Sequence, residues 1–263
     1  MILLLCPIIM LSVLLAGCTS NGMSEIYLMS LRYNDYDYTI TKGPAQVSSH
    51  IAQVVQNVTQ TGNGTVFEVR AGYMGLCVGQ SSEDRICSSS AKALANMIEA
   101  KRRTIQVGNS SIETIPDPLN LIMIAEEFRQ KIVFSGLIYV AVAMCFMAFI
   151  ALSTFPGWLE MDDDESGGMF KAFPSRSVSH FSLLASILGF GFGFISVLWQ
   201  HINSSSTATM AEVLTYGAVK GHVGRASMAL GWISVFVLSL VSVGILVMIK
   251  SISLIRRLTE CSE

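Results

Sequence analysis

Two cysteines stand where they could react with each other. The chain has six cysteines; three lie in apolar stretches and one lies in the C-terminal tail, which leaves Cys77 and Cys87 in the long polar segment after the first apolar stretch. In an oxidising compartment two such thiols can form a disulfide, and closing this short loop would stabilise the segment by roughly 2–3 kcal/mol. Two free thiols are the alternative.

Residues that could catalyse a reaction are sparse. The chain contains no nucleophile elbow and no phosphate-binding loop. The run Gly189, Gly191, Gly193 has the wrong spacing for a nucleotide loop and lies in apolar surroundings. No metal-ligand spacing connects the four histidines, His50, His180, His201 and His222. We therefore expect no enzymatic activity and no cofactor.

Four Asn-x-Ser/Thr acceptors indicate which segments face the secretory lumen, because N-glycosylation requires lumenal exposure. Three precede the second apolar stretch and one lies between the third and the fourth. They are Asn57, Asn63, Asn109 and Asn203. This placement predicts a long first outer segment and a short second one.

The composition places these residues in a membrane protein. Of the 263 residues, 51% are hydrophobic and 14% are charged, which is outside the range of ordinary soluble domains. The formal net charge is only -2 and no long basic run occurs, so we expect membrane lipid and no nucleic acid as a partner. A helix needs roughly 20 apolar residues to cross a bilayer core. Four stretches approach or exceed this length: 1–18, 132–155, 181–199 and 226–249.

The four stretches and the acceptors together predict a four-pass protein with both termini in the cytoplasm. The connections are then an extracellular domain over 19–131, a cytoplasmic loop over 156–180, a second extracellular loop over 200–225 and a cytoplasmic tail over 250–263. The first stretch has alternative fates. It could be removed as a signal peptide, or it could be processed as a bacterial lipoprotein at Cys18, since Leu15 to Cys18 matches such a cleavage box.

The outer segment 19–131 is long enough to be a small domain. Ile26–Tyr33 and Thr65–Val78 are rich in Val, Ile, Tyr and Phe and predict strands of an antiparallel sheet, with a turn at Gly62–Gly64. After Cys87, the serines of Ser88–Ser90 can cap a helix. One face of that helix would carry Ala91, Leu94, Ala95 and Ile98.

A second helix is predicted just before the second apolar stretch. Asp117 can cap its start and Pro118 suits the first helical position. The residues Leu119–Gln130 are compatible with a helix that leads into the membrane.

Small residues in the third and fourth apolar stretches predict close helix packing. Ala185, Gly189 and Gly193 recur every four residues, and Ser227 and Gly231 repeat this spacing. Such faces let helices approach each other closely in a membrane. They are compatible with a homo-oligomer and with association with another membrane protein.

The block at residues 70–95, RAGYMGLCVGQSSEDRICSSSAKALA, resembles known families. Its Gly-aromatic-x-Gly-x-Cys segment with a later Cys resembles the signature of the claudin superfamily of four-pass proteins. Its Gly-Leu-Cys-Val and Cys-Ser-Ser-Ser-Ala runs resemble the fungal pheromone-induced calcium regulator and membrane fusion family. Arg85 and Ile86 stand where some relatives carry a tryptophan. The signature positions would be Gly72, Tyr73, Gly75, Cys77 and Cys87, with the two cysteines bonded.

The resemblance implies a fold and a function. The fold would be membrane α-helical: a claudin-like four-helix transmembrane bundle with a small extracellular antiparallel β-sheet plus helix domain. The function would be low-affinity calcium influx and fusion of mating cells at the plasma membrane, as a regulator or channel component. A structural adhesion or membrane-organising protein of the same fold, without a role in ion flux, is the alternative.

If calcium is a transported or regulatory ion for this protein, acidic side chains are its candidate ligands. Asp162–Glu165 lacks the alternating spacing of a calcium loop and is interpreted as a solvated cytoplasmic loop. Glu83 and Asp84, between the two cysteines, are the weak candidates for a metal site, although solvated turn residues are more common. The apolar stretches contain no Asp, Glu, Lys or Arg. Calcium would therefore pass between subunits or through a partner calcium channel.

Overall fold

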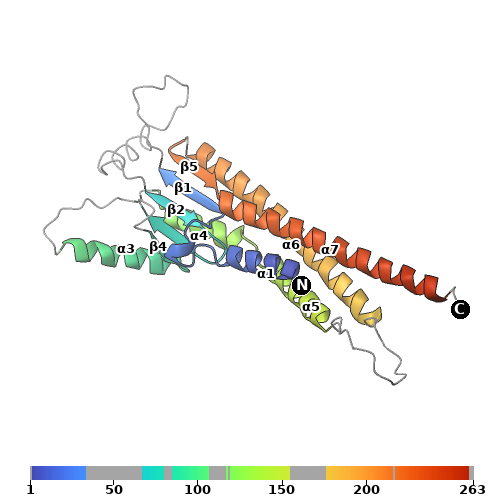
Figure 1. Cartoon of the computed structure of the whole chain (residues 1–263). Coiled ribbons are helices and arrows are strands. Elements are labelled where there is room, and N and C mark those ends of the chain that lie inside the picture. Colours follow the sequence, from blue (N-terminus) through green and yellow to red (C-terminus); the bar gives the residue numbers. More distant parts are fainter. Residues whose placement is uncertain are drawn as a thin grey trace. The chain divides into compact units, whose positions relative to one another are not determined.

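The computed structural model describes residues 2–33, 67–79, 85–106, 117, 119–154, 176–215 and 217–260 (Figure 1). The chain divides into two compact units, which we describe separately. The first comprises Met1–Ser12, Gly136–Ser196 and Gly231–Glu263 and is helical where described. The second comprises Val13–Ser135 and Val197–Leu230 and contains the sheet.

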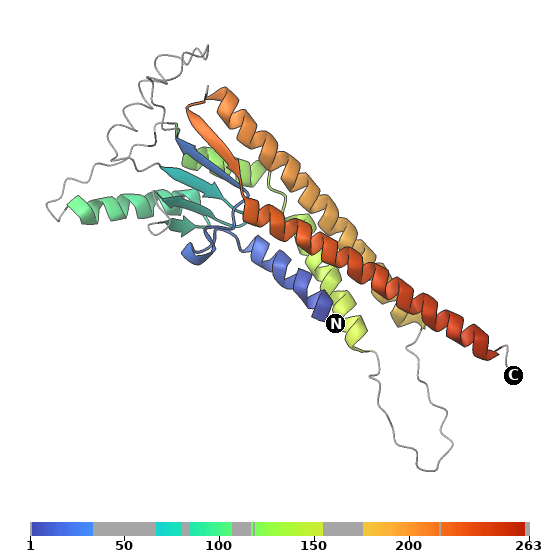
Figure 2. The same ribbon diagram turned by 45° about the horizontal axis from the view of Figure 1, so that its top comes forward.

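A five-stranded antiparallel sheet forms the core of the second unit, which confirms the predicted small sheet. Its strands run in the order β4-β3-β2-β1-β5. Their bounds are β1 Met29–Tyr33, β2 Glu68–Ala71, β3 Leu76–Gly79, β4 Ile86–Ser88 and β5 Val219–Val223. β5 lies beside β1 at one edge, although it comes from the segment predicted as the second extracellular loop (Figures 1 and 2).

The sheet has one apolar and one polar face, because successive side chains of a strand point to opposite sides. The apolar face carries buried residues such as Leu31, Val69 and Leu76. Helix α4 (Leu121–Lys131) contacts β2 and β3. A Cβ added at Gly221 of β5 would lie 2.6 Å from the Cα of Ala208, so the same face is closed there by helix α6.

The predicted strand Thr65–Val78 is a hairpin of two strands, β2 and β3. The Gly72 amide donates a 2.9 Å hydrogen bond to the Gly75 carbonyl, and this turn reverses the chain. Arg129 of α4 donates to the Met74 carbonyl at 2.8 Å and holds the turn against the helix. The other predicted strand, Ile26–Tyr33, is shorter and begins at Met29. The predicted turn Gly62–Gly64 lies outside the described residues.

Helix α3 (Ala91–Gln106) follows the second cysteine as predicted. Its first turn closes with a 2.9 Å hydrogen bond from the Leu94 amide to the Ser90 carbonyl. The predicted face is only partly buried: Leu94 is fully buried, whereas Ala95 is exposed. α3 contacts β3, β4 and α4 through this narrow stripe.

Asp117 caps helix α4, but from farther away than predicted. Its Oδ1 accepts from the Leu121 amide at 2.9 Å and its Oδ2 from the Ile122 amide at 3.3 Å. The helix begins at Leu121 rather than Leu119, because Asn120 adopts a left-handed conformation with φ of 53°. It ends at Lys131, and residues 132–135 separate it from α5 (Gly136–Ser153), so it does not continue into the apolar stretch.

Three helices are long and apolar enough to cross a membrane: Gly136–Ser153, Ser177–Leu214 and Arg225–Leu254. The predicted first span corresponds to α1 (Ile2–Leu15), whose 14 residues rise about 21 Å, less than the ~30 Å of a bilayer core. The described residues therefore include three such helices and one shorter apolar helix.

Helices α6 (Arg176–Leu214) and α7 (Arg225–Glu260) extend well beyond their predicted ends. Residues 200–214, predicted as loop, and residues 250–260, predicted as tail, are helical. Neither segment contains a Gly or Pro that would end a helix. The polar residues after each apolar stretch therefore indicate where the apolar stretch ends, but the helix continues through them.

The predicted small-residue stripe of α6 lies at helix contacts within the helical unit. Ala185 is buried, and a Cβ added at Gly189 would lie 2.9 Å from the Sγ of Cys145 on α5. A Cβ at Gly193 would meet Leu238 of α7 at 3.6 Å. In α7, the side chain of Ser227 and the residue Gly231 are also buried.

Candidate functional site

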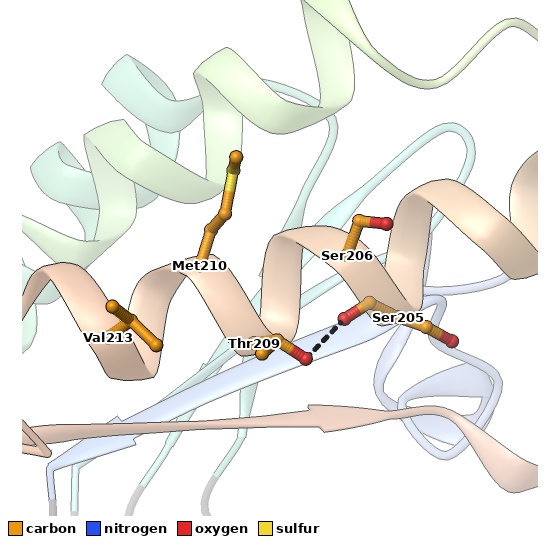
Figure 3. Close-up of a pocket in the computed structure, with 5 residues that line it drawn as sticks. All are labelled: Ser205, Ser206, Thr209, Met210 and Val213. Atoms are coloured by element: carbon orange, nitrogen blue, oxygen red, sulfur yellow. Dashed lines mark hydrogen bonds between the residues drawn. The ribbon is translucent and has the colours of Figure 1, made fainter.

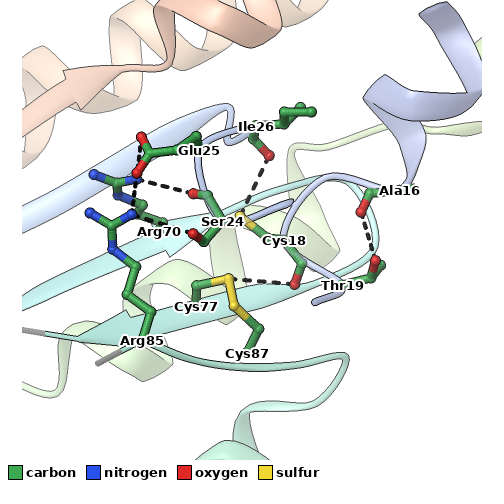
Figure 4. The surroundings of a disulfide bond; sticks show 10 residues. All are labelled: Ala16, Cys18, Thr19, Ser24, Glu25, Ile26, Arg70, Cys77, Arg85 and Cys87. Carbon is green, nitrogen blue, oxygen red and sulfur yellow. Dashed lines mark hydrogen bonds and ion pairs between the residues drawn. A yellow bond between two sulfur atoms is a disulfide. The ribbon is translucent and has the colours of Figure 1, made fainter. Parts of the chain in front are cut away.

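The two signature cysteines form a disulfide (Figure 4). Cys77 of β3 and Cys87 of β4 are directly opposite each other and are bonded. The bond lies on the polar face of the sheet, and the Cys77 sulfur is 3.7 Å from the carbonyl oxygen of Cys18. The disulfide therefore joins β3 to β4 and lies beside the segment that follows α1.

The two signature glycines allow this close approach. A Cβ added at Gly72 would lie 2.8 Å from the carbonyl carbon of Gly17, and a Cβ at Gly75 would collide with the Cys18 carbonyl. A side chain at either position would push the hairpin away from the chain that follows α1. The glycines of the motif are thus explained by a contact with residues more than fifty positions earlier. Tyr73, between them, is buried.

Four charged side chains form a network on the same face. Figure 4 draws Glu25, Arg70 and Arg85. The Nη1 atom of Arg70 lies 2.9 Å from Glu25 Oε2, and its Nε atom lies 3.1 Å from Glu68 Oε1. Arg85 pairs with Glu25 and approaches Glu68, with Nη2 and Oε2 3.9 Å apart. Each glutamate therefore contacts both arginines, and the charges of the network sum to zero.

Arg70 is the centre of this network and is 8% exposed. Its guanidinium lies 4.4 Å from the centre of the Tyr27 ring and donates to the Ser24 carbonyl at 3.1 Å. A buried arginine is tolerated because carboxylates and hydrogen bonds compensate for its lost hydration. The hydrogen bond from Arg85, followed by that from Arg70, holds the pKa of the Glu25 carboxyl below its usual range.

Cys18 is a free thiol beside the disulfide. It is buried, and its sulfur donates to the Ile26 carbonyl at 3.6 Å. Burial raises the pKa of the Cys18 thiol to about 12. The thiol therefore stays protonated at neutral pH and is a poor nucleophile for exchange with the disulfide.

Several sequence-predicted residues lie outside the described part of the chain. They are the acceptors Asn57, Asn63 and Asn109, the metal candidates Glu83 and Asp84, and the acidic run Asp162–Glu165. Asn203 is in α6, where its side-chain amide donates to the Trp199 carbonyl at 2.8 Å. Within the described ranges, no three His, Cys, Asp or Glu side chains are grouped to hold a metal ion.

A shallow pocket of about 470 Å³ lies along α6 (Figure 3). It is lined by Ser205, Ser206, Thr209, Met210 and Val213. The Thr209 hydroxyl donates to the Ser205 carbonyl at 3.0 Å, as is common for threonine in a helix. The lining has no titratable group, so it offers no acid, base or metal ligand.

Comparison with known families identifies the chain. Residues 53–251, well over half of the sequence, match the family described as Ca²⁺ regulator and membrane fusion protein Fig1. The chain belongs to the Fig1 family. The match includes the disulfide, the two signature glycines and the three long apolar helices, and it confirms the resemblance to the calcium regulator and membrane fusion family. No curated protein and no solved structure matches the chain.

The Fig1 family is described as a regulator and membrane fusion protein, not as an enzyme. The sequence motif did not identify the charge network, although Arg70 and Arg85 each stand two positions before a signature residue. That spacing is a signal, because alternate residues of a strand share one face. Glu25 carries no such signal, since it comes from the connection after α1.

Proposed function

We propose that this Fig1 family member is a claudin-like four-pass protein of the plasma membrane that supports low-affinity calcium influx and membrane fusion during fungal mating. The family membership carries the calcium and fusion roles. The disulfide-pinned sheet built from the signature residues is the part of the molecule through which it acts. The mating context follows the resemblance of the 70–95 block.

The proposed topology follows from the order of the elements. β1 to β4 precede α5, and β5 lies between α6 and α7, yet all five strands form one sheet. If α5, α6 and α7 each cross the membrane, these strands meet on one side only when α5 and α6 cross in opposite directions. A disulfide in the sheet favours the extracellular side for these strands. That side would place the C-terminus in the cytoplasm, and a spanning α1 would place the N-terminus there as well.

Retention of α1 is supported by the contacts of the chain that follows it. Gly72 and Gly75 closely approach Gly17 and Cys18. Cleavage of the chain as a signal peptide or as a lipoprotein would remove these contact residues or leave Cys18 as a free N-terminus. The buried Cys18 side chain is also poorly placed to carry a lipid. Intact mass of the purified protein tests this: loss of the first 17 or 18 residues would contradict the four-pass proposal.

The proposed role in influx is that of a regulator or a channel subunit rather than a pore formed by one chain. No Asp, Glu, Lys or Arg lies within α5 or in the stretches 181–199 and 226–249 of α6 and α7. Ion pathways through membranes are normally lined by such groups or by exposed carbonyls. Calcium would therefore pass between copies of the protein or through an associated channel. The same absence favours the second candidate, an adhesion or membrane-organising protein.

Calcium uptake and cell fusion, measured together, separate the two candidates. Pheromone-stimulated uptake of calcium and the frequency of fused mating pairs are compared in cells with and without the gene. Loss of both is expected, and restoring fusion with added calcium would indicate that influx acts upstream. Unchanged uptake with lost fusion would reject the influx role and leave the organising one.

A further inference from the structure

The polar face of the sheet carries two cations outside the charge network. Strand β1 pairs with β5 at this edge of the sheet (Figure 1). Their register places Arg32 directly opposite Lys220, and Ser30 directly opposite His222. Side chains opposite each other in an antiparallel pair share one face, with Cβ atoms about 5 Å apart. Like charges in this arrangement destabilise a sheet.

The neighbouring carboxylates do not offset this repulsion. Glu68 lies opposite Arg32 on β2, but its two oxygens approach the arginines of the network. Among the described residues, neither Arg32 nor Lys220 forms an ion pair. Glu212 of α6 is the remaining acid whose charge acts on this edge, through its effect on His222. With Arg32, Lys220 and the single carboxylate of Glu212, the β1–β5 edge therefore has a net positive charge.

A buried hydroxyl with no partner lies on the same face. Ser30 is 1% exposed, and its Oγ makes no hydrogen bond within the described part of the chain. A buried polar group without a partner costs about 1–3 kcal/mol, so its presence in a sheet calls for a ligand. Arg32 and His222 are exposed and Lys220 is half-buried, which leaves the edge open to one.

We propose that Arg32, Lys220, His222 and Ser30 bind an oxyanion of phosphate type. A negatively charged phosphate would pair with both Arg32 and Lys220, and the guanidinium and ammonium groups would supply charge-assisted hydrogen bonds. The Ser30 hydroxyl and a ring N–H of His222 add neutral donors. Bound anion replaces the repulsion between Arg32 and Lys220 with two attractions, which explains why these residues stand opposite each other. The phosphate can be free or part of a lipid headgroup.

Thermal unfolding of the full-length protein in neutral detergent tests the site. Inorganic phosphate is expected to raise the unfolding midpoint above that in sodium chloride of equal ionic strength. Arg32→Gln and Lys220→Gln should each weaken the apparent affinity for phosphate by about tenfold or more. Lys92→Gln changes an exposed lysine of α3 and should keep the wild-type affinity. Without phosphate, Lys220→Gln should unfold no lower than wild type, which separates lost binding from lost folding.

The same assay with short-chain phosphatidic acid or phosphatidylcholine distinguishes free phosphate from the phosphate of a lipid headgroup as the bound anion. A response to inorganic phosphate that both Gln variants lose supports a site for a free anion. A response to phosphatidic acid alone, lost in the same variants, supports a site for a lipid headgroup. Equal responses of wild type and both Gln variants, or no response to either probe, would overturn the proposal.

Discussion

The phenol of Tyr33 donates a 2.6 Å hydrogen bond to Oδ1 of Asp117, which joins the end of β1 to the start of α4. Tyr33 also accepts from the Leu119 amide at 3.2 Å. Burial, together with the hydrogen bond to Asp117, raises the pKa of Tyr33, so the phenol remains a donor throughout the physiological range. The pair therefore fixes the helix that packs on the apolar face of the sheet.

Removing this link should destabilise the second unit. Asp117→Ala leaves both the phenol and the first α4 amides without their acceptor, and we expect a loss of about 2–3 kcal/mol in the free energy of unfolding. Tyr33→Phe should cost about 1 kcal/mol. Denaturant unfolding in detergent measures both. Glu127→Gln, an exposed carboxylate of α4 paired with Lys131, is the control. A cost for Asp117→Ala no larger than that control would contradict the capping role.

Alanine at the second signature glycine should prevent normal folding. The Cβ of Gly75→Ala collides with the Cys18 carbonyl, and the nearest atoms all belong to the Cys18–Thr19 backbone, which cannot move aside as a flexible side chain can. We expect a strong loss of protein at the cell surface, measured by surface labelling. Gly22→Ala is the matched control, because a Cβ there meets nothing within 4 Å. Equal surface levels of the two variants would show that the contact with Cys18 is not needed.

Two glycines of α6 form a second matched pair. Gly189→Ala places a methyl 2.9 Å from the Cys145 sulfur, whereas at Gly191 the added methyl is in open space. Overpacking of this kind costs about 1–3 kcal/mol. Thermal unfolding in detergent should therefore show a lower midpoint for Gly189→Ala only. The double variant Gly189→Ala, Cys145→Ala should recover most of that loss, and a failure to recover would reject the proposed contact.

The charge network predicts a specific response to acid. Because the pKa of Glu25 is lowered in the folded state, this carboxylate adds stability above its unfolded pKa, and that stability is lost as the pH falls through the folded pKa. Glu25→Gln should therefore be less stable than wild type at neutral pH, and the two should converge in acid. Unfolding midpoints measured from neutral to acidic pH test this. A constant difference between the two proteins would contradict the shift.

The sequence predicted those features that depend on neighbouring residues. Uninterrupted apolar stretches located α5, α6 and α7, and the positions of Cys77 and Cys87 in the one long polar segment identified the pair. The period of the residues after Cys87 predicted α3. In each case the signal lies within about twenty residues of the structure that it predicts.

The features that the sequence did not predict depend on distant contacts. β5 is a five-residue strand between two long helices, and only its pairing with β1 makes it a strand. The turn that splits the predicted strand Thr65–Val78 is required by the passage of Gly17 and Cys18 beside Gly72 and Gly75. Glu25 pairs with Arg70 and Arg85, which follow it by 45 and 60 residues in the chain. The pattern of residues within a short segment does not indicate such contacts.

We propose that the disulfide-pinned sheet is the part of this Fig1 family member that supports calcium entry. Calcium uptake is measured in deletion cells that carry wild type, Cys77→Ser or Cys6→Ser, each at verified and equal surface level. Cys6 is a free cysteine of α1, so its replacement controls for loss of a thiol. We expect wild-type uptake with Cys6→Ser and little or none with Cys77→Ser. Full uptake with Cys77→Ser at the surface would contradict it.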